Sequence, residues 1–316
     1  MEATDSAAPA VVGEVTLEAG ASGFGGAEAQ ASALGIRSQT QFGDFRRRFF
    51  RNKLAVVGLA MVAAVLVAAV AAPVLAPYDP KAQTLSNALA SPSSAHWFGT
   101  DENGRDVLSR VIYGTQIAVI IGLSAILLAL VIGVVLGSLA GYLGRAWDAV
   151  IMRVADVFFA FPLLIGAIVI VLVIGRGLTP VVLALGIFSW ATISRLLRSS
   201  ILSVREAEYV EAARSLGAGR WRIVTRHVLP NSMAPVLVFA MVSVAIAIVA
   251  EASLSYLGVG LQPDVPDWGN MISAGQKFFG YKDYLWFFPS MAVVFTVLGF
   301  VFVGDGLRDA LDPRLR

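Results

Sequence analysis

Cysteine is absent from the chain, and the only two histidines, His96 and His227, lie far apart in the sequence. The first absence excludes disulfides, thiolate chemistry and cysteine-based metal centres, and the second leaves no ligand set for a histidine-based metal site. Charged residues make up 15% of the chain, against about a quarter in soluble domains. A net charge of +2 is too small and too dispersed to predict a nucleic-acid partner.

Phosphate-binding loops are missing as well, because neither G-x-x-x-x-G-K-[ST] nor a G-x-G-x-x-G between a strand and a helix occurs. The segments between the long apolar runs are too short for an independent nucleotide-binding domain, which needs about a hundred residues or more. The sequence therefore predicts no cofactor bound by this chain. A transporter built on it would work passively, couple to an ion gradient, or use ATP hydrolysed by a partner.

Apolar length is what the chain has in abundance: hydrophobic residues make up 57% of it, and the mean hydropathy is +0.74. Six uncharged runs reach the roughly 18 to 25 residues that cross a bilayer as a helix. They are continuous apolar blocks, whereas barrel strands alternate. We predict an all-α membrane protein, with a domain of residues 54–308 whose six transmembrane helices lie at about 54–75, 117–143, 157–174, 178–194, 232–250 and 284–304.

The flanking segments differ from this domain in composition. Residues 1–44 are rich in Ala, Gly, Ser and Glu, which predicts a disordered tail and no cleaved signal. Residues 45–53, FRRRFFRNK, suit a basic interfacial segment or, equally, a stop-transfer flank. Most of the 24 lysines and arginines lie inside if the tail, the connection 195–231 and the C-terminal segment 309–316 are cytoplasmic. The positive-inside rule therefore predicts that both termini are cytoplasmic.

The basic connection 195–231 separates the possible energy sources. Residues 207–216 favour a short helix. Gly217 is suited to end it in the left-handed conformation, and a second basic helix runs on to Pro230. Small side chains around Ala213 let another protein approach closely. The segment is thus predicted to be a docking element.

The same segment carries a family resemblance. Glu211-Ala212-Ala213, three residues, Gly217, nine residues and then His227-Val228-Leu229-Pro230 resembles the EAA motif of ABC importer permeases, EAA-x3-G-x9-I-x-L-P. His227 departs from it, because isoleucine is usual there. Three further segments are similar to dipeptide, oligopeptide and nickel permeases of the C-subunit type: FGTDENGRDVLSRVIYG (98–114), DWGNM (267–271) and DALDPR (309–314). Together the motifs cover roughly residues 45 to 316.

The resemblance implies a type I ABC importer permease of a bacterial inner membrane, paired with a second homologous permease. Its cytoplasmic loop would be a coupling helix that docks in a groove of one ATPase subunit. The complex would contain two ATPase subunits, or one fused ATPase, which hold the ATP and Mg. An extracytoplasmic substrate-binding protein would deliver the cargo. The residues carried over as ATPase-facing are Glu211, Ala212, Ala213, Leu216 and Gly217. Dipeptides or oligopeptides are the favoured substrates; nickel, glutathione and other small solutes share the pattern.

Two features of the spans carry alternatives. Gly133, Gly137 and Gly141 recur at every fourth residue, the small-xxx-small pattern of close helix contacts in lipid. They predict either an interface with the sister permease or packing within this subunit. Glu251 either lines the translocation path or is an interfacial carboxylate near the outer water boundary. Asp156 is interpreted as an i,i+3 partner of Arg153.

The outer loops are interpreted as contact surfaces without catalytic groups. Asp267, Trp268 and Asn270 predict either a surface for the docked binding protein or a self-packed cap. The polar run from Asp101 to Asp106 lacks the twelve-residue pattern of a calcium loop, so turn formation is preferred there. His96 is interpreted as a polar loop residue.

Two other classes of membrane protein remain as alternatives. An ion-coupled carrier would need charged residues and broken helices near the bilayer midplane in both halves of a repeat, and the predicted helices have no repeat and no charge in their middle. A membrane enzyme would need convergent nucleophiles, metal ligands or acid pairs, which the sequence does not supply at useful spacing.

Overall fold

The computed structural model describes residues 41–311, and within this range the regular structure is helical, with no β-strand and one isolated bridge between Thr100 and Asp106. Residues 1–40 of the predicted tail and residues 312–316 of the predicted C-terminal segment lie outside the described residues. The helical bundle begins at Phe45, within a first helix that starts at Gln41.

The helices follow one another as α2 (Gln41–Arg51), α3 (Lys53–Val70), α4 (Ala72–Leu75), η1 (Leu85–Asn87), α5 (Val107–Ser138), η2 (Leu139–Leu143), α6 (Arg145–Ala160), α7 (Leu163–Ile174), α8 (Leu178–Val204), α9 (Glu208–Ser215), α10 (Arg220–Ile223), η3 (Val224–Val228), α11 (Leu229–Ser232), α12 (Ala234–Tyr256), α13 (Trp268–Gln276) and α14 (Tyr284–Leu311).

Five of these helices, α3, α5 with η2, α8, α12 and α14, are long and apolar enough to cross a membrane. The pair α6–α7 makes a sixth span if it is counted as one, although its two helices are bent by 91°. The predicted class, an all-α protein with about six transmembrane helices, is confirmed by the described residues. The interfacial segment 45–53 falls within α2 and the start of α3, which Asn52 caps by accepting the backbone N–H groups of Leu54 and Ala55.

Several predicted boundaries were wrong because helices continue past the end of an apolar run. The second span begins at Val107 rather than near Ile117, and α8 continues from Ser194 to Val204. Arg110, Arg195 and Arg198 therefore lie inside helices, in the parts that extend beyond the uncharged runs. Ion pairs make this possible: Arg198 binds Asp148 of α6 through two nitrogens, and Arg195 binds Asp156 of α6 at 2.6 Å.

The third span differs most from the prediction. A single helix at 157–174 was expected, but α6 starts at Arg145 and ends at Ala160, and α7 begins at Leu163. Pro162 causes the break, because it lacks an N–H and forces the preceding Phe161 into an extended conformation (φ −103°, ψ 130°).

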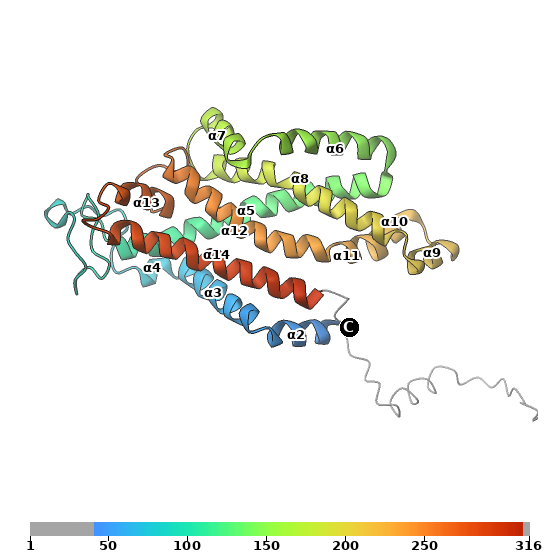
Figure 1. Ribbon diagram of the computed structural model, residues 1–316, viewed down its shortest axis with the longest axis horizontal. Helices are drawn as coiled ribbons and strands as arrows, with labels where there is room; N and C mark the ends of the chain where they lie inside the picture. The colour runs from blue at the N-terminus through green and yellow to red at the C-terminus, as the bar shows by residue number, and fades with distance from the viewer. Residues whose placement is uncertain (1–40, 312–316) are drawn as a thin grey trace, which may run out of the picture. The chain divides into compact units, whose positions relative to one another are not determined.

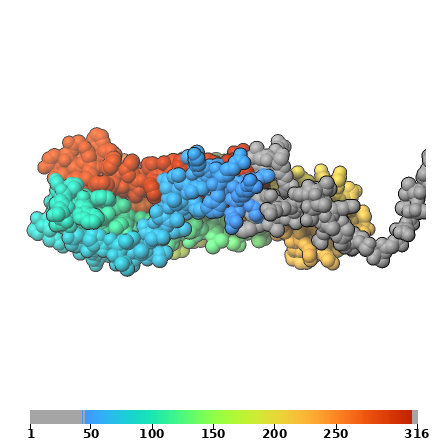
Figure 2. Space-filling view, turned by 90° about the horizontal axis from the view of Figure 1, so that it is seen from below, coloured from blue at the N-terminus to red at the C-terminus, as the bar shows by residue number. Residues whose placement is uncertain are grey.

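The centre of the bundle is the contact between α5 and α8, which lie side by side with α12 (Figure 1). Fully buried Ile121 and Ala125 of α5, Leu185 of α8 and Ile248 of α12 belong to one apolar core. On the opposite side of this core, α3 lies along α14, as Figure 2 shows from below. Phe49 of α2 is buried close to Gly306 of α14.

The bundle has two distinct ends (Figure 1). One end carries α13 and the segment 76–106, and we call it the α13 end. The other carries the α9 hairpin, residues 205–231, which joins α8 to the helices leading into α12. The candidate functional features divide between these two ends and the helix contacts that connect them.

Candidate functional site

The α9 hairpin is held to the bundle by one face and exposed on the other. Val210 of α9 is fully buried, in an apolar cluster that also includes Ile223 and Val228. Glu211 and Ala212 are exposed, and Ala213 is half-buried. Since Val210 fixes the helix from beneath, the residues after it are presented outward on a defined helix. This is the placement that a docking element needs.

The turn after α9 depends on Gly217, which has φ +80°. Its N–H donates to the carbonyl of Arg214, and the N–H of Ala218 donates to that of Ala213, so the last carbonyls of the helix are satisfied. Nothing lies within 4 Å of the position that a Cβ at Gly217 would occupy. Glycine is therefore required for the backbone conformation and not for space.

Apolar surface gathers around this turn. Leu216 is 89% exposed and Trp221 of α10 is 79% exposed, and Tyr209 is also exposed. Large apolar side chains so exposed on a short polar hairpin are typical of protein interfaces. The sequence prediction included Leu216 but missed Trp221; an aromatic residue between Arg220 and Arg222 was the available signal.

The glycine stripe of α5 faces α8 of the same subunit. A Cβ at Gly133 would lie 2.7 Å from Ile193, one at Gly137 would lie 2.8 Å from the carbonyl oxygen of Ser194, and one at Gly141 would lie 2.9 Å from Ile201. The stripe is thus the seam on which α5 and α8 approach closely. Of the two alternatives from the sequence, the structure places these glycines in internal packing and leaves no room there for a sister permease.

At the α13 end, Asp267 and Trp268 are buried at 1% and 2% exposure. Asp267 caps α13 by accepting the N–H of Asn270 at 2.9 Å, and the Trp268 indole N–H donates to the carbonyl of Val111 at 3.0 Å. The structure does not offer these two side chains to a docked protein; it favours the self-packed cap. Asn270 is partly exposed, so a binding-protein contact stays a prediction for it alone.

Glu251 lies in α12 beneath this cap and is 1% exposed. It accepts a hydrogen bond from the Ser255 hydroxyl at 3.0 Å. In this conformation Glu251 is buried within the bundle, and its role in the translocation path or at the outer water boundary stays a prediction.

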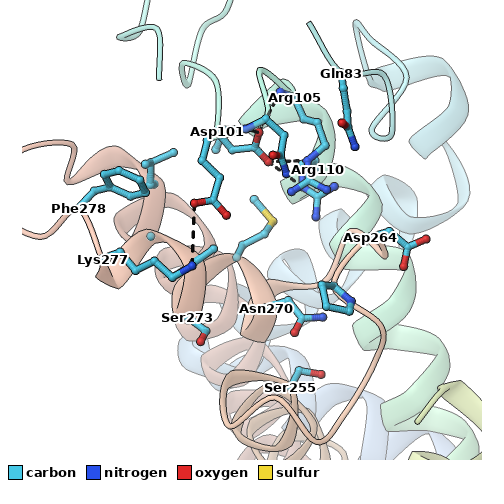
Figure 3. A pocket seen from close by; sticks show the side chains of 18 of the residues that line it. Gln83, Asp101, Arg105, Arg110, Ser255, Asp264, Asn270, Ser273, Lys277 and Phe278 are labelled. Carbon is cyan, nitrogen blue, oxygen red and sulfur yellow. Dashed lines mark hydrogen bonds and ion pairs between the residues drawn. The ribbon is translucent and has the colours of Figure 1, made fainter. Parts of the chain in front are cut away.

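A cavity of about 450 Å³ opens beside this cap. Figure 3 shows Asp101, Arg105 and Arg110 gathered opposite Asn270 and Ser273 of α13. Arg105 binds Asp101 at 2.6 Å, and Lys277 reaches Glu102 at 4.0 Å across the cavity (Figure 3). Opposite charges pair across this cavity, but the Lys277–Glu102 pair is exposed to solvent, and such pairs contribute little to stability.

The polar run 101–106 forms a turn, as expected. Asp101 accepts the backbone N–H groups of Asn103 and Arg105, each at 2.9 Å, and Asp106 caps α5 by accepting the N–H of Ser109 at 2.8 Å. His96 is more than a loop residue, because its Nδ1 lies 2.9 Å from Asp106. Within residues 41–311 no group of three or more His, Asp or Glu side chains is arranged to hold a metal ion.

We expect the packing of α13 to weaken as pH rises. Burial raises the pKa of Asp267 above its ordinary value. A carboxyl group whose pKa is raised on folding stabilises the fold at low pH, and this contribution is lost as pH rises through the raised pKa. Asp267→Asn keeps the oxygen that caps α13 and removes the titrating carboxyl group, so its unfolding temperature should depend less on pH than that of the wild type.

The measurement is thermal unfolding of the purified protein across the pH range in which the wild type remains folded. Asp264→Asn is the matched control, because Asp264 is an exposed carboxylate in the same loop. If Asp267→Asn and Asp264→Asn changed the pH dependence of the unfolding temperature equally, titration of the buried Asp267 carboxyl group would not be its source.

An all-helical bundle with enough apolar helices to cross a membrane five or six times defines a multi-pass membrane protein. Comparison with known proteins makes this specific. Residues 133–316 match the family described as binding-protein-dependent transport system inner membrane component, and residues 40–92 match the N-terminal TM domain of oligopeptide transport permease C. The chain belongs to the first of these families, and is a permease subunit of the inner membrane.

Three relatives show how far the similarity extends. The chain is 42% identical over 279 residues to the glutathione transport system permease protein GsiD of Pectobacterium atrosepticum, covering 88% of this chain and 93% of that protein. It is 40% identical over 286 residues to the oligopeptide transport system permease protein OppC of Bacillus subtilis, covering 90% and 94%. It is 40% identical over 266 residues to the dipeptide transport system permease protein DppC of Alkalihalophilus pseudofirmus, covering 84% and 88%.

Proposed function

We propose that this chain forms half of the translocation path of an ATP-driven importer of short peptides. The observation that carries the proposal is the α9 hairpin, in which buried Val210 holds an exposed helix and Leu216 projects into solvent. Because the sequence has no nucleotide-binding motif, ATP hydrolysis by a partner could drive this chain only through a surface that contacts the partner. The EAA spacing from Glu211 to Pro230 lies on this hairpin and the helices that return from it.

The peptide class is supported by relatives named for oligopeptide, dipeptide and glutathione transport. Glutathione is itself a small peptide, and the 42% identity to a glutathione permease makes it the second candidate cargo. Nickel and other small solutes, the remaining alternatives from the sequence motifs, are no better supported.

The partners in this proposal are a second homologous permease, an extracytoplasmic substrate-binding protein, and two ATPase subunits or one fused ATPase that hold ATP and Mg. The α9 end would face the cytoplasm together with both termini, as the distribution of lysine and arginine favours. Glu211, Ala212, Ala213, Leu216 and Gly217 would contact the ATPase, and Trp221 joins them.

ATP-driven closure of the ATPases would move the two α9 hairpins together and rock the two permeases about their contact. Because α9 is joined to α8 on one side and, through α10 and α11, to α12 on the other, its displacement would be transmitted to two central helices. Reversing a 1:99 preference between inward-open and outward-open states takes about 5.5 kcal/mol of differential binding.

The test is copurification of the full-length chain from its native membrane, with mass spectrometry of the partners and an ATPase assay of the complex. We expect a second permease, ATPase subunits and a peptide-type binding protein. A stable chain that transports substrate with a proton gradient and no ATPase partner would contradict the proposal and favour the ion-coupled carrier.

A further inference from the structure

The break between α6 and α7 leaves backbone groups without helical partners part-way along the third span. The two axes differ by 91°, and Pro162, the residue that precedes α7, makes no side-chain cap. The break lies beside the middle of α8, because the Phe158 ring of α6 stacks edge-on with Phe188 at 5.4 Å, and Gly166 of α7 lies against the same ring.

Such a break cannot face lipid tails cheaply. In hydrocarbon, each unpaired backbone N–H or C=O costs several kcal/mol, so non-helical backbone at membrane depth is found inside protein or along a water-filled cavity. The described chain has a cavity at this position, with a volume of about 220 Å³, between α6, α8 and α12. We call it the aromatic cavity.

Its walls are mainly phenylalanine: Phe158, Phe159, Phe161, Phe188 and Phe239. Phe159 and Phe161 are 46% and 55% exposed, so they form the rim, and Arg195 covers the Phe159 ring at 4.2 Å. Ser189 and Ser243 also line the cavity; both donate their hydroxyl hydrogens to carbonyls of their own helices, which leaves oxygen lone pairs free to accept.

The size and the chemistry of the cavity fit one side chain of a larger molecule. Pockets that enclose a whole small ligand measure about 300–1,000 Å³, and this one is smaller. Phenylalanine rings attract other aromatic groups edge-on or offset. The cavity is also bounded by α8 and α12, the two helices joined through the α9 hairpin, so movement of the hairpin would change its shape.

We propose that the aromatic cavity is a substrate contact on the translocation path, which takes an apolar side chain, aromatic in preference to small, from the passing peptide. This inference rests on the proposed function of peptide import. The broken backbone at the rim favours a hydrated path over a lipid tail as the occupant. The contact lets the permease itself, in addition to the binding protein, discriminate between peptides.

The first test uses the complete transporter, with its sister permease, ATPases and binding protein, reconstituted in liposomes. ATP-driven uptake of Ala-Phe is compared with that of Ala-Ala. For Phe161→Ala we expect the ratio of the two rates to fall about threefold to tenfold, the range expected for the loss of one aromatic contact. Phe287→Ala is the matched control, because Phe287 is a similarly exposed phenylalanine of α14 that does not line the cavity.

An unchanged ratio in Phe161→Ala, with both peptides still imported, would overturn the proposed contact while leaving peptide import intact. Absence of ATP-driven peptide uptake in the wild-type complex would instead overturn the proposed function. Loss of both peptides in Phe161→Ala, with the complex assembled, would assign the rim a structural role and also overturn the contact.

A second measurement does not depend on transport rates. The chain has no cysteine, so Phe161→Cys introduces a single thiol that a water-soluble maleimide can label and mass spectrometry of this chain can read. We expect labelling in the assembled complex, slowed by Ala-Phe more than by Ala-Ala. A thiol that stays unlabelled would show that lipid or the sister permease covers the cavity, which overturns the proposal.

Discussion

Replacing Gly217 with valine is expected to reduce ATP-driven uptake at least about tenfold while the chain still folds and enters the membrane. Gly217 has φ +80°, a conformation that costs an ordinary L-residue roughly 1–2 kcal/mol and a β-branched one more. The turn would relax to another conformation and re-aim the end of α9. In enzymes, a misplacement of reacting groups by about 1 Å can lower the reaction rate about a hundredfold. We expect ATP-driven uptake to be similarly sensitive to the position of α9.

Gly219→Val is the matched control for this experiment. Gly219 lies in the same turn, with open space at its Cβ position, but its φ of −64° and ψ of 150° suit any residue. The two variants add the same side chain at nearly the same place, so they differ mainly in backbone strain. Uptake, ATPase activity and copurification of the ATPases should fall in Gly217→Val alone. Equal uptake by both variants would show that transport does not depend on the backbone conformation at Gly217.

Replacing Gly137 with leucine is expected to destroy most of the folded protein. Its Cβ would lie 2.8 Å from the carbonyl oxygen of Ser194 and 3.1 Å from the side chain of Leu197, so α5 and α8 would have to separate along their contact. Overpacking of a close-packed core costs typically about 1–3 kcal/mol when side chains can adjust. Here the first obstacle is backbone, which adjusts less, so the loss should lie at or above that range.

Val135→Leu is the control, because Val135 is on the same helix, 55% exposed, and already carries a branched side chain. The measurement is the yield of monodisperse protein in detergent and its unfolding temperature. Wild-type yield and stability in Gly137→Leu, together with a failure to pair with the sister permease, would favour the intersubunit alternative and contradict the packing described here.

The spans and the short helix that ends before Gly217 could be predicted from the sequence because both are local properties. A continuous apolar run has only one low-energy structure in lipid, and Gly217 marks a helix end through the backbone of a single residue. The limits of the helices could not be predicted in this way. The helices α5 and α8 extend beyond the apolar runs to include Arg110 and Arg198. Arg110 donates to the carbonyls of Pro80 and Val265, and Arg198 binds Asp148. Because these partners lie far away in the sequence, a local reading of the chain does not reveal them.

By itself, the sequence determined that this is an all-helical membrane protein of about six spans. It also predicted that the chain binds no nucleotide and that the motif from Glu211 to Pro230 docks on an ATPase. Only the tertiary structure decided which partner each ambiguous residue meets. The stripe at Gly137 faces α8, Trp268 is buried against α5, and Glu251 is buried in α12, which packs against α13. The reason is physical: helix formation follows from the residues nearby in the chain, whereas burial, pairing and cavities arise where segments far apart in the chain come together.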